Sequence, residues 1–277
     1  MEPEQVAALA WPGQQVEIEP LGGGITNHNY KVQVADETFV LRIAGADTEL
    51  LGIDRQAEHD AALVGASIDV GPEVVEFVSG CLVTRFVEGS PVPLEEMRRP
   101  EELREVAALL RRIHDGPAIP GRFDSFRVVE DYRRTAEEHG VEIPPEYEAA
   151  KTSADRIEEA LGQRPLEPCH NDLLNANFIR SPEGIKIVDW EYAGMGDRFF
   201  DLANFAVNHE LGADEEEELL EAYFGEVADE HREHQRAMRF MSDFREAMWG
   251  VVQQGISNLD VDFVDYAQKH FARLDLS

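Results

Sequence analysis

Apolar residues change their spacing once along the chain, close to residue 88. Before that point, short runs of β-branched and aromatic residues are separated by turn-forming residues, a pattern that is typical of strands joined by turns. One longer segment, residues 54–66, has its apolar residues at helical spacing, with Ala57, Ala61, Leu63 and Val64 expected on the inner side. The pattern predicts one main helix and five strands, near residues 16–18, 30–34, 39–43, 74–78 and 81–87.

Beyond residue 88 the apolar residues recur every three or four positions, which is the spacing of helices that pack against a core. Pro100 opens the first of these segments, and Gly116 follows its end. Helices are predicted over residues 100–114, 128–139, 146–161, 201–211, 214–224, 232–256 and 263–274. The predicted fold class is therefore α+β, with a sheet-rich first part and a larger, mainly helical second part.

The exception in the helical part is the segment 169–189, which carries the most distinctive polar residues. Asp172 is followed five residues later by Asn177, and apolar β-formers on both sides of residues 181–184 predict a hairpin with that stretch as its turn. The hairpin would return the chain so that Asp189 lies beside Asp172 and Asn177. Two carboxylates and one amide oxygen form a hard ligand set that suits Mg²⁺.

Each of these polar residues has an ordinary explanation when it is taken singly, since Asp and Asn are common in turns and helix caps. Their combination is a His-x-Asp loop, an Asn five residues on, a turn, and an apolar strand that ends in Asp. This combination favours phosphoryl transfer, which needs one Asp to accept or orient the proton of the acceptor hydroxyl. The same reaction needs an Asn and a second Asp for the metal ions on ATP.

Two stretches around these residues resemble the choline/ethanolamine kinase branch of the aminoglycoside-phosphotransferase-like, protein-kinase-like superfamily. They read HNDLLNANF (170–178) and IVDWEYAGMGDRFFDLANF (187–205). The resemblance implies a two-lobed kinase-like fold, with a nucleotide-covering N-lobe over residues 1–87 and a C-lobe with the catalytic loop and acceptor site over 88–277. It also implies Asp172 as the catalytic base, Asn177 and Asp189 as Mg²⁺ ligands, and His170 and Asp201 as structural support.

The first part of the chain supplies the candidates for ATP binding. A glycine run alone is more often a flexible turn, but GGITNHNY (23–30) resembles the nucleotide-covering loop of the choline kinase branch. Arg42 stands where protein kinases carry a phosphate-binding lysine, and Glu58 is its predicted partner; a surface arginine and an exposed helix glutamate are the plain alternatives. Residues 86–89 are expected at a hinge whose backbone is free to bind adenine. The predicted ATP-binding residues are Gly23, Gly24, Thr26, Asn27, Arg42, Glu58, Phe86 and Glu88.

Two features bear on the acceptor of the phosphate. Tyr192 comes three residues after Asp189, and residues 244–271 resemble the C-terminal helices of choline and ethanolamine kinases, where aromatic faces enclose an ammonium head. The eukaryotic enzymes carry two tryptophans three residues apart; here Trp249 matches the second, and Glu246 stands at the first. Trp249 has ordinary core packing as its alternative, and Glu246 either binds an ammonium or is a solvated glutamate. Tyr192, Glu246 and Trp249 are the predicted substrate-binding residues.

Composition limits what the chain can bind. Its formal charge of −31 at pH 7 argues against nucleic acid, because phosphate backbones would be repelled. Lysine is almost absent, so the acidic surface fits either a high-GC genome or adaptation to high salt. No apolar run is long enough to span a membrane, and the acidic N-terminus does not resemble a signal peptide. Cys81 and Cys169 lie far apart without metal-site spacing, so we expect a reduced, cytoplasmic protein. The lack of a long apolar run predicts no membrane insertion.

The sequence therefore predicts an ATP- and Mg²⁺-dependent small-molecule kinase that transfers the γ-phosphate to the hydroxyl of choline or a related amino alcohol such as ethanolamine. An aminoglycoside- or sugar-type phosphotransferase is the alternative within the superfamily. A non-catalytic nucleotide-binding module is the alternative from another class of protein. The expected partners are ATP and the small-molecule acceptor, and a homodimer is left open.

Overall fold

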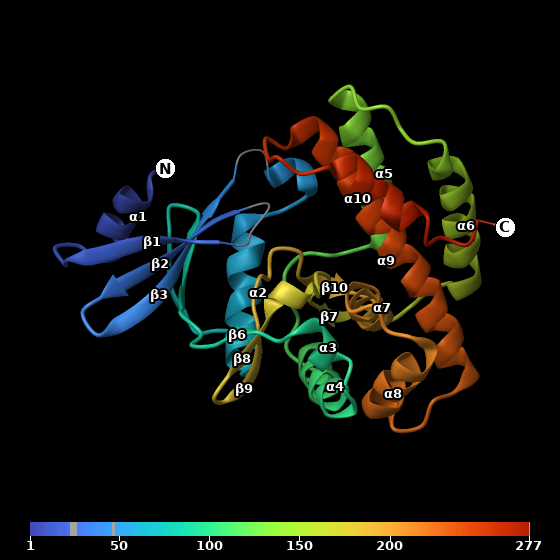
Figure 1. The fold of residues 1–277 in the computed structure, drawn as a ribbon, viewed down its shortest axis with the longest axis horizontal. Coiled ribbons are helices and arrows are strands. Elements are labelled where there is room, and N and C mark those ends of the chain that lie inside the picture. Colours follow the sequence, from blue (N-terminus) through green and yellow to red (C-terminus); the bar gives the residue numbers. More distant parts are fainter. Residues whose placement is uncertain (23–26, 46–47, 277) are drawn as a thin grey trace.

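The computed structural model describes residues 1–22, 27–45 and 48–276, which form a sheet-rich lobe and a larger helical lobe (Figure 1). The first lobe holds an antiparallel sheet in the order β1-β2-β3-β5-β4. Its strands are β1 (Val16–Leu21), β2 (Asn27–Val34), β3 (Glu37–Ala44), β4 (Val74–Val78) and β5 (Cys81–Arg85). The prediction of five strands is confirmed, and the predicted lobe boundary at residues 87 and 88 falls just after β5.

Alternation of apolar and polar residues gives the sheet one buried face. Along β3, Phe39, Leu41 and Ile43 are buried, while the residues between them are partly exposed. The N-terminal helix α1 (Pro3–Ala10) covers this face, and the following Trp11 packs its ring 5.1 Å from that of Phe39. The sheet thus has a small core of its own, separate from the main core of the molecule.

The main helix of the first lobe, α2 (Arg55–Ser67), lies between the sheet and the helical lobe (Figure 1). Its first turn is capped by Asp54, whose side chain accepts hydrogen bonds from two backbone amides. The predicted inner side was wrong at Leu63, which is 44% exposed; the fully covered positions include Ala61 and Gly65. Gly65 is required because a Cβ there would lie 2.5 Å from the ring of Trp190. The contact joins α2 to the segment that follows the predicted metal ligand Asp189.

The helical lobe is built around α9 (Asp229–Ile256), in which every residue from 241 to 253 is buried. Its neighbours include α5, α7 and α10, while α4 packs against α8. The remaining helices are α3 (Leu94–Met97), α4 (Pro100–His114), α5 (Ser125–Glu138), α6 (Glu146–Leu161), α7 (Arg198–Asn208), α8 (Ala213–Phe224) and α10 (Phe263–Phe271).

Helix boundaries differ from the prediction where a capping residue was overlooked. Helix α5 begins at Ser125 because Asp124 caps it, and α7 begins at Arg198 because the Asp197 side chain accepts the Phe199 amide. Helix α9 begins at residue 229, and α10 ends at residue 271, three residues before the predicted end. Across the part of the chain that the structure describes, no helix is both long enough and apolar enough to cross a bilayer.

Candidate functional site

The predicted catalytic loop follows β7 (Glu167–Cys169) and ends in a single 3₁₀ turn at residues 175–177. Strands β8 (Phe178–Ser181) and β9 (Gly184–Ile187) then form a hairpin, with β6 (Ser90–Pro91) against its outer edge. The hairpin and its turn at 181–184 confirm the prediction. The backbone amide of residue 188 donates to the carbonyl of Asn177 at 3.0 Å, which brings the following Asp189 back to the loop.

Asp172 is buried at the base of this loop and is held through its backbone. Its amide donates to Nδ1 of His170 at 3.3 Å, and its carbonyl accepts the side-chain Nδ2 of Asn177 at 2.9 Å. With its nitrogen engaged, the Asn177 amide leaves its oxygen for another partner. Burial raises the pKa of the Asp172 carboxyl well above its ordinary value, and the charge of Arg245 opposes that rise.

His170 supports the loop from below. Its Nε2 lies 3.2 Å from the carbonyl of Val188, and its ring meets that of Trp190 edge-on at 4.9 Å. Burial lowers the pKa of His170, so the ring is neutral, with Nε2–H donating and Nδ1 accepting. The residue fits the predicted structural role, because both nitrogens serve the backbone of the loop and of the strand beyond it.

Asp189 has a backbone φ of +70°, a left-handed conformation that aspartate tolerates better than most residues. Its Oδ1 lies 2.5 Å from Nη1 of Arg42, and the same nitrogen lies 2.9 Å from Oε1 of Glu58. The predicted Arg42–Glu58 pair is therefore present, and Glu58 is not an exposed helix glutamate, because it is only 3% exposed. Burial would raise the pKa of Asp189, but the charge and hydrogen bond of Arg42 outweigh it and lower that pKa.

Glu191 is a member of this cluster that the sequence analysis did not assign. Its Oε2 accepts Nδ2 of Asn27 at 2.7 Å and lies 3.4 Å from Nη1 of Arg55. Burial, with the nearby charge of Asp189, raises the pKa of Glu191 to about 7. Carboxylate oxygens of Glu58, Asp189 and Glu191 all lie within 4.8 Å of one another, an oxygen-rich set that suits a divalent cation. The sequence did contain a signal for Glu191, because it is a second acidic residue two positions after Asp189.

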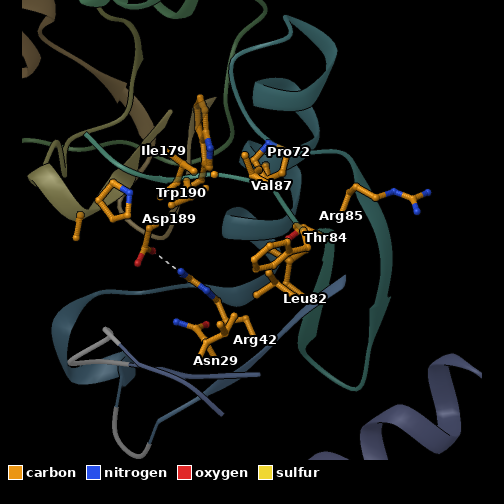
Figure 2. A pocket seen from close by; sticks show the side chains of 18 of the residues that line it. Asn29, Arg42, Pro72, Leu82, Thr84, Arg85, Val87, Ile179, Asp189 and Trp190 are labelled. Carbon is orange, nitrogen blue, oxygen red and sulfur yellow. Dashed lines mark hydrogen bonds and ion pairs between the residues drawn. The ribbon is translucent and has the colours of Figure 1, made fainter. Parts of the chain in front are cut away.

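A cavity of about 390 Å³ opens between the two lobes beside this cluster. Figure 2 shows Asn29, Arg42 and Asp189 at one end, with the Arg42–Asp189 ion pair drawn between them. The other end is mainly apolar and is lined by residues of β5, the segment after it and β8, among them Leu82, Val87 and Ile179. An apolar slot that leads to a charged end matches the division of a nucleotide into base and phosphates.

The hinge prediction was wrong in one respect. The amide of Phe86 donates to the carbonyl of Thr38 at 3.0 Å, so this backbone group is not free for adenine. Phe86 does line the cavity, whereas Glu88 is exposed and lies outside its lining. The next residue, Gly89, approaches β8 so closely that a Cβ would lie 2.1 Å from the carbonyl oxygen of Arg180. The predicted Gly23, Gly24 and Thr26 fall outside the described residues.

Asp201, in the first turn of α7, holds the catalytic loop through two backbone amides. Its Oδ2 accepts the amide of His170 at 2.8 Å, and its Oδ1 accepts that of Asn171 at 2.7 Å. One turn later, Oδ1 of Asn204 accepts the amide of Leu173 at 2.7 Å. Three amides of the loop, those of residues 170, 171 and 173, are thus satisfied by side chains of α7. This is the bracing role that the resemblance implied for Asp201.

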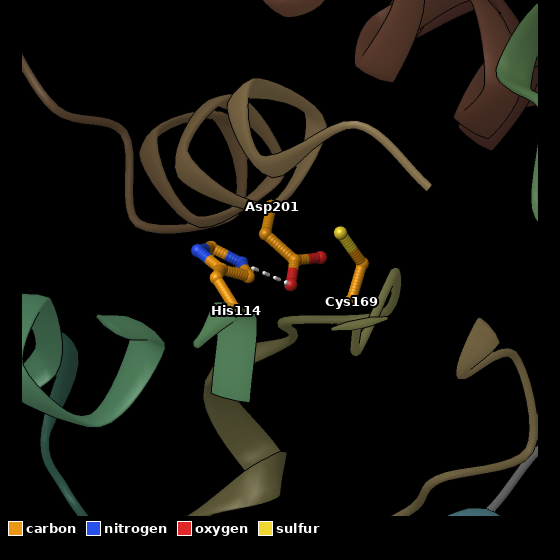
Figure 3. A group of neighbouring side chains, drawn as sticks. All are labelled: His114, Cys169 and Asp201. Atoms are coloured by element: carbon orange, nitrogen blue, oxygen red, sulfur yellow. Dashed lines mark hydrogen bonds and ion pairs between the residues drawn. The ribbon is translucent and has the colours of Figure 1, made fainter. Parts of the chain in front are cut away.

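His114 and Cys169 lie on either side of the Asp201 carboxylate (Figure 3). Nε2 of His114 is 3.1 Å from Oδ2 of Asp201, and its Nδ1 is 2.7 Å from the hydroxyl of Tyr223. All three residues of the group are buried, and burial raises the pKa of the Cys169 thiol well above its usual value. Both oxygens of Asp201 and both nitrogens of His114 already have partners. We therefore interpret the group as support for the catalytic loop and not as a metal site.

Of the predicted acceptor residues, Glu246 and Trp249 lie on α9, and the ring of Tyr192 lies against the guanidinium of Arg245 on the same helix. Glu246 is 2% exposed, so the solvated alternative was wrong. Its Oε1 accepts Nη1 of Arg245 at 2.6 Å, and its Oε2 accepts the Tyr266 hydroxyl at 2.6 Å. Trp249 packs edge-on against the rings of two α10 residues, one of them Tyr266 at 5.5 Å.

Arg245 is the residue of this region that sequence reasoning missed. Its guanidinium is buried, with Nη1 3.5 Å from Oδ1 of Asp172 and its central carbon 4.5 Å from the ring centre of Tyr192. A signal was present, because Arg245 and Glu246 are adjacent charges inside a stretch of α9 that is otherwise rich in apolar residues. Arg245 therefore places a positive charge between Glu246, a predicted acceptor residue, and Asp172, the predicted catalytic base.

Comparisons with known proteins agree with this arrangement. Residues 17–240 match the family model described as the phosphotransferase enzyme family. The crystal structure of a choline/ethanolamine kinase family protein from Mesorhizobium loti is 33% identical, with a TM-score of 0.81 over 98% of this chain and 92% of that chain. Choline kinase LicA from Streptococcus pneumoniae is 27% identical, with a TM-score of 0.77 over 97% and 96% of the two chains. Human ethanolamine kinase 2 is 27% identical over 94% of this chain and 76% of its own length.

Proposed function

Because the chain belongs to the phosphotransferase enzyme family and is similar to its choline/ethanolamine kinase members over nearly its whole length, we propose that it transfers the γ-phosphate of ATP to the hydroxyl of an amino alcohol. The class of reaction, phosphoryl transfer to an alcohol, follows from the family. The amino alcohol follows from the similarity to choline and ethanolamine kinases.

One observation carries the proposal: the cavity and the catalytic loop meet at Asp189. Arg42 and Asp189 form the charged end of the cavity, and the loop that carries Asp172 reaches the same place through the β8–β9 hairpin. The negative charge of Asp189 is close enough to raise the pKa of Asp172. A nucleotide with its base in the apolar slot would therefore present its phosphates between Arg42 and Asp172.

The donor set fits Mg²⁺. Asp189 and Asn177 were predicted to hold it, and the carboxylate of Glu191 lies beside Asp189 in the same oxygen-rich group. Arg42 keeps the pKa of Asp189 low, so this carboxylate is ionised and able to bind a cation at neutral pH. When bound, the metal offsets the negative charge of the phosphate oxygens.

The protein's own contribution to the reaction is mainly positioning. Asp201 and Asn204 fix the loop backbone, and the contacts of His170 and Asn177 fix the orientation of Asp172. Asp172 then orients the acceptor hydroxyl and accepts its proton as the phosphoryl group leaves ATP. Burial favours this role, because it excludes bulk water that would otherwise compete with the acceptor. Use of ATP also supports the predicted cytoplasmic location.

The test is acceptor-dependent release of ADP from Mg·ATP. The purified chain is screened against choline, ethanolamine, other amino alcohols, an aminoglycoside and a sugar, with chelator-treated samples as the metal control. The proposal expects turnover with at least one amino alcohol and loss of turnover when Mg²⁺ is removed. Turnover with the aminoglycoside or the sugar alone would overturn the acceptor class.

A further inference from the structure

The groups that were predicted to bind the ammonium head of the acceptor instead contact a cation of the protein, Arg245. Arg245 lies 2.6 Å from the carboxylate of Glu246 and places its guanidinium over the ring of Tyr192. These are the carboxylate and the aromatic face that were expected to bind a substrate cation. Arg245 also contacts Asp172, the predicted catalytic base.

Each oxygen of Glu246 already accepts a hydrogen bond from another side chain of the protein. Oε1 accepts from Arg245 and Oε2 accepts from the hydroxyl of Tyr266, each at 2.6 Å. An incoming ammonium group would have to share these oxygens with Arg245 and Tyr266 or displace one of them. Displacing Arg245 would leave a fully buried guanidinium with a weakened ion pair, which is a strongly unfavourable arrangement.

Arg245 itself is incompletely bonded. Its Nη1 serves Glu246 and Asp172, whereas Nε and Nη2 are buried with no hydrogen-bond acceptor among the described residues. A guanidinium can only donate, and a charged donor that is buried without an acceptor costs free energy. Nε and Nη2 form one edge of the planar group, the edge that binds the two oxygens of a carboxylate through parallel hydrogen bonds.

We infer that the acceptor is an amino alcohol that also carries a carboxylate, which the Nε–Nη2 edge of Arg245 binds while the hydroxyl faces Asp172. The inference rests on the proposed transfer of phosphate to an amino alcohol and narrows its substrate class. Charge favours a zwitterion, because Arg245 already shares its charge between two carboxylates, those of Asp172 and Glu246. A zwitterionic acceptor brings no net charge into this site, whereas a plain hydroxy acid would add a third negative group.

A competing role for the free edge is to donate to the phosphoryl group during transfer. In that role the guanidinium would act on every acceptor alike, since the phosphoryl group is common to all of them. In the carboxylate-binding role it would act only on acceptors that carry the carboxylate. Acceptor preference therefore separates the two roles.

The experiment uses two matched pairs of acceptors that differ by a carboxylate: ethanolamine with serine, and 3-amino-1-propanol with homoserine. Choline is added as the quaternary ammonium. Binding of each compound is measured by calorimetry on the wild-type chain with Mg²⁺ and a non-hydrolysable ATP analogue, and transfer is measured with Mg·ATP. We expect the carboxylate-bearing member of at least one pair to be preferred by roughly 10- to 100-fold in affinity and in kcat/KM.

The variant Arg245→Lys keeps the positive charge next to Glu246 but removes the two-donor edge. We expect it to lose the preference within the matched pair, mainly through a rise in KM for the carboxylate-bearing compound. Arg236→Lys, an exposed position on the same helix, is the matched control and should leave the preference unchanged. If Arg245→Lys does not fold, as judged by circular dichroism, the wild-type binding data alone decide the inference.

The outcomes separate this inference from the proposed function. If the wild type binds serine or homoserine preferentially but transfers phosphate to no acceptor, the proposed function fails and carboxylate recognition stands. If choline or ethanolamine is used with the same or a higher kcat/KM than the carboxylate-bearing compounds, the inference fails and the proposed function stands. An equal loss of kcat for all acceptors in Arg245→Lys assigns the free edge to the phosphoryl group and also overturns the inference, as does binding of neither carboxylate compound.

Discussion

Two buried arginines, Arg42 and Arg245, stand on opposite sides of the predicted reaction centre. Arg42 comes from the sheet and contacts Asp189, the predicted metal ligand, while Arg245 comes from α9 and contacts Asp172, the predicted catalytic base. Each has a glutamate partner, Glu58 and Glu246 respectively. A buried arginine–glutamate ion pair is thus present on both the nucleotide side and the acceptor side of the site.

The two arginines differ in how they could be foreseen. The position of Arg42 matched a phosphate-binding residue shared by kinases, so its partner on α2 could be named from the sequence. Arg245 lies on the acceptor side, where relatives that act on different alcohols need different contacts. The contacts of the nucleotide side could therefore be predicted from the family resemblance, whereas those of the acceptor side could not.

The largest effect is expected from disabling the nucleotide side. Asp189→Ala removes a carboxylate from the oxygen-rich group and leaves Arg42 with Glu58 as its nearest partner. We expect turnover to fall by about 100-fold or more and the affinity for Mg·ATP to weaken, because charge stabilisation at the phosphates is lost. Steady-state kinetics with varied Mg·ATP provide the measurement. Asp60→Ala on α2 is the control, and unchanged nucleotide affinity in Asp189→Ala would remove Asp189 from the metal site.

Disabling the acceptor side should cost stability as well as activity. Glu246→Gln keeps the shape of the side chain but removes the charge that compensates buried Arg245. We expect the free energy of unfolding to fall by roughly 3 kcal/mol or more, because the remaining charge is buried without its closest partner. Urea denaturation measures this, with the exposed Glu233→Gln on the same helix as the control. A loss that matches the control would show that the Arg245–Glu246 pair contributes little.

A buried group without any charge partner gives a contrast to both arginines. His209 is stacked on Phe205 at 4.0 Å, and burial lowers its pKa to about 4, below the ordinary value of 6.5. Between these values the unfolded chain binds a proton that the folded chain does not. The stability contributed by neutral His209 is therefore complete above pH 6.5 and is lost as the pH falls toward 4, by about 3 kcal/mol.

This pH effect is measured by urea denaturation of wild type and His209→Gln from pH 7 to pH 4. In His209→Gln, the fall in the free energy of unfolding between pH 6.5 and pH 4 should be smaller by the contribution of His209. In His28→Gln, at an exposed site, the fall should be the same as in wild type. Parallel curves for wild type and His209→Gln would contradict the assignment of a neutral, buried imidazole at this position.

The smallest effect concerns the outer end of the acceptor-side network. Tyr266→Phe removes the hydroxyl that donates to Oε2 of Glu246 at 2.6 Å and leaves one carboxylate oxygen without its donor. We expect a loss of about 1–3 kcal/mol in the free energy of unfolding and a modest rise in acceptor KM. If the variant is as stable as wild type and its KM for ATP changes instead, Tyr266 does not belong to the acceptor side.

Much of the fold followed from residue patterns, because strands with alternating burial and helices with a buried stripe leave clear periodic signals. The hairpin that returns Asp189 to Asp172 was predictable for the same reason. Leu63 was placed wrongly because periodicity shows that a helix has a buried face but cannot rank alanine, glycine and leucine within it. Gly65 takes the covered position because the ring of Trp190, distant in sequence, fills the space.

Contacts that depend on three-dimensional partners were the ones missed. Phe86 has its amide bonded to Thr38, and no local sequence feature reveals which strand neighbour takes that hydrogen bond. Glu246 was read either as an ammonium ligand or as a surface residue, because its partner Tyr266 lies on another helix. When a helix is buried on all sides, the partners of its polar residues depend on how the neighbouring helices pack against it. The sequence does not reveal that packing.

The central claim is that Asp172 directs the γ-phosphate of ATP to the hydroxyl of an amino alcohol, and phosphorus NMR tests it most directly. Wild type is incubated with Mg·ATP and either ethanolamine or serine, and the spectra are compared with those of Asp172→Asn. The account predicts a phosphomonoester resonance, coupled to the protons of the acceptor's methylene group, that grows as ATP is converted to ADP. In Asp172→Asn this resonance should grow roughly 10²- to 10⁴-fold more slowly. Formation of inorganic phosphate alone, or an equal rate in Asp172→Asn, would contradict the account.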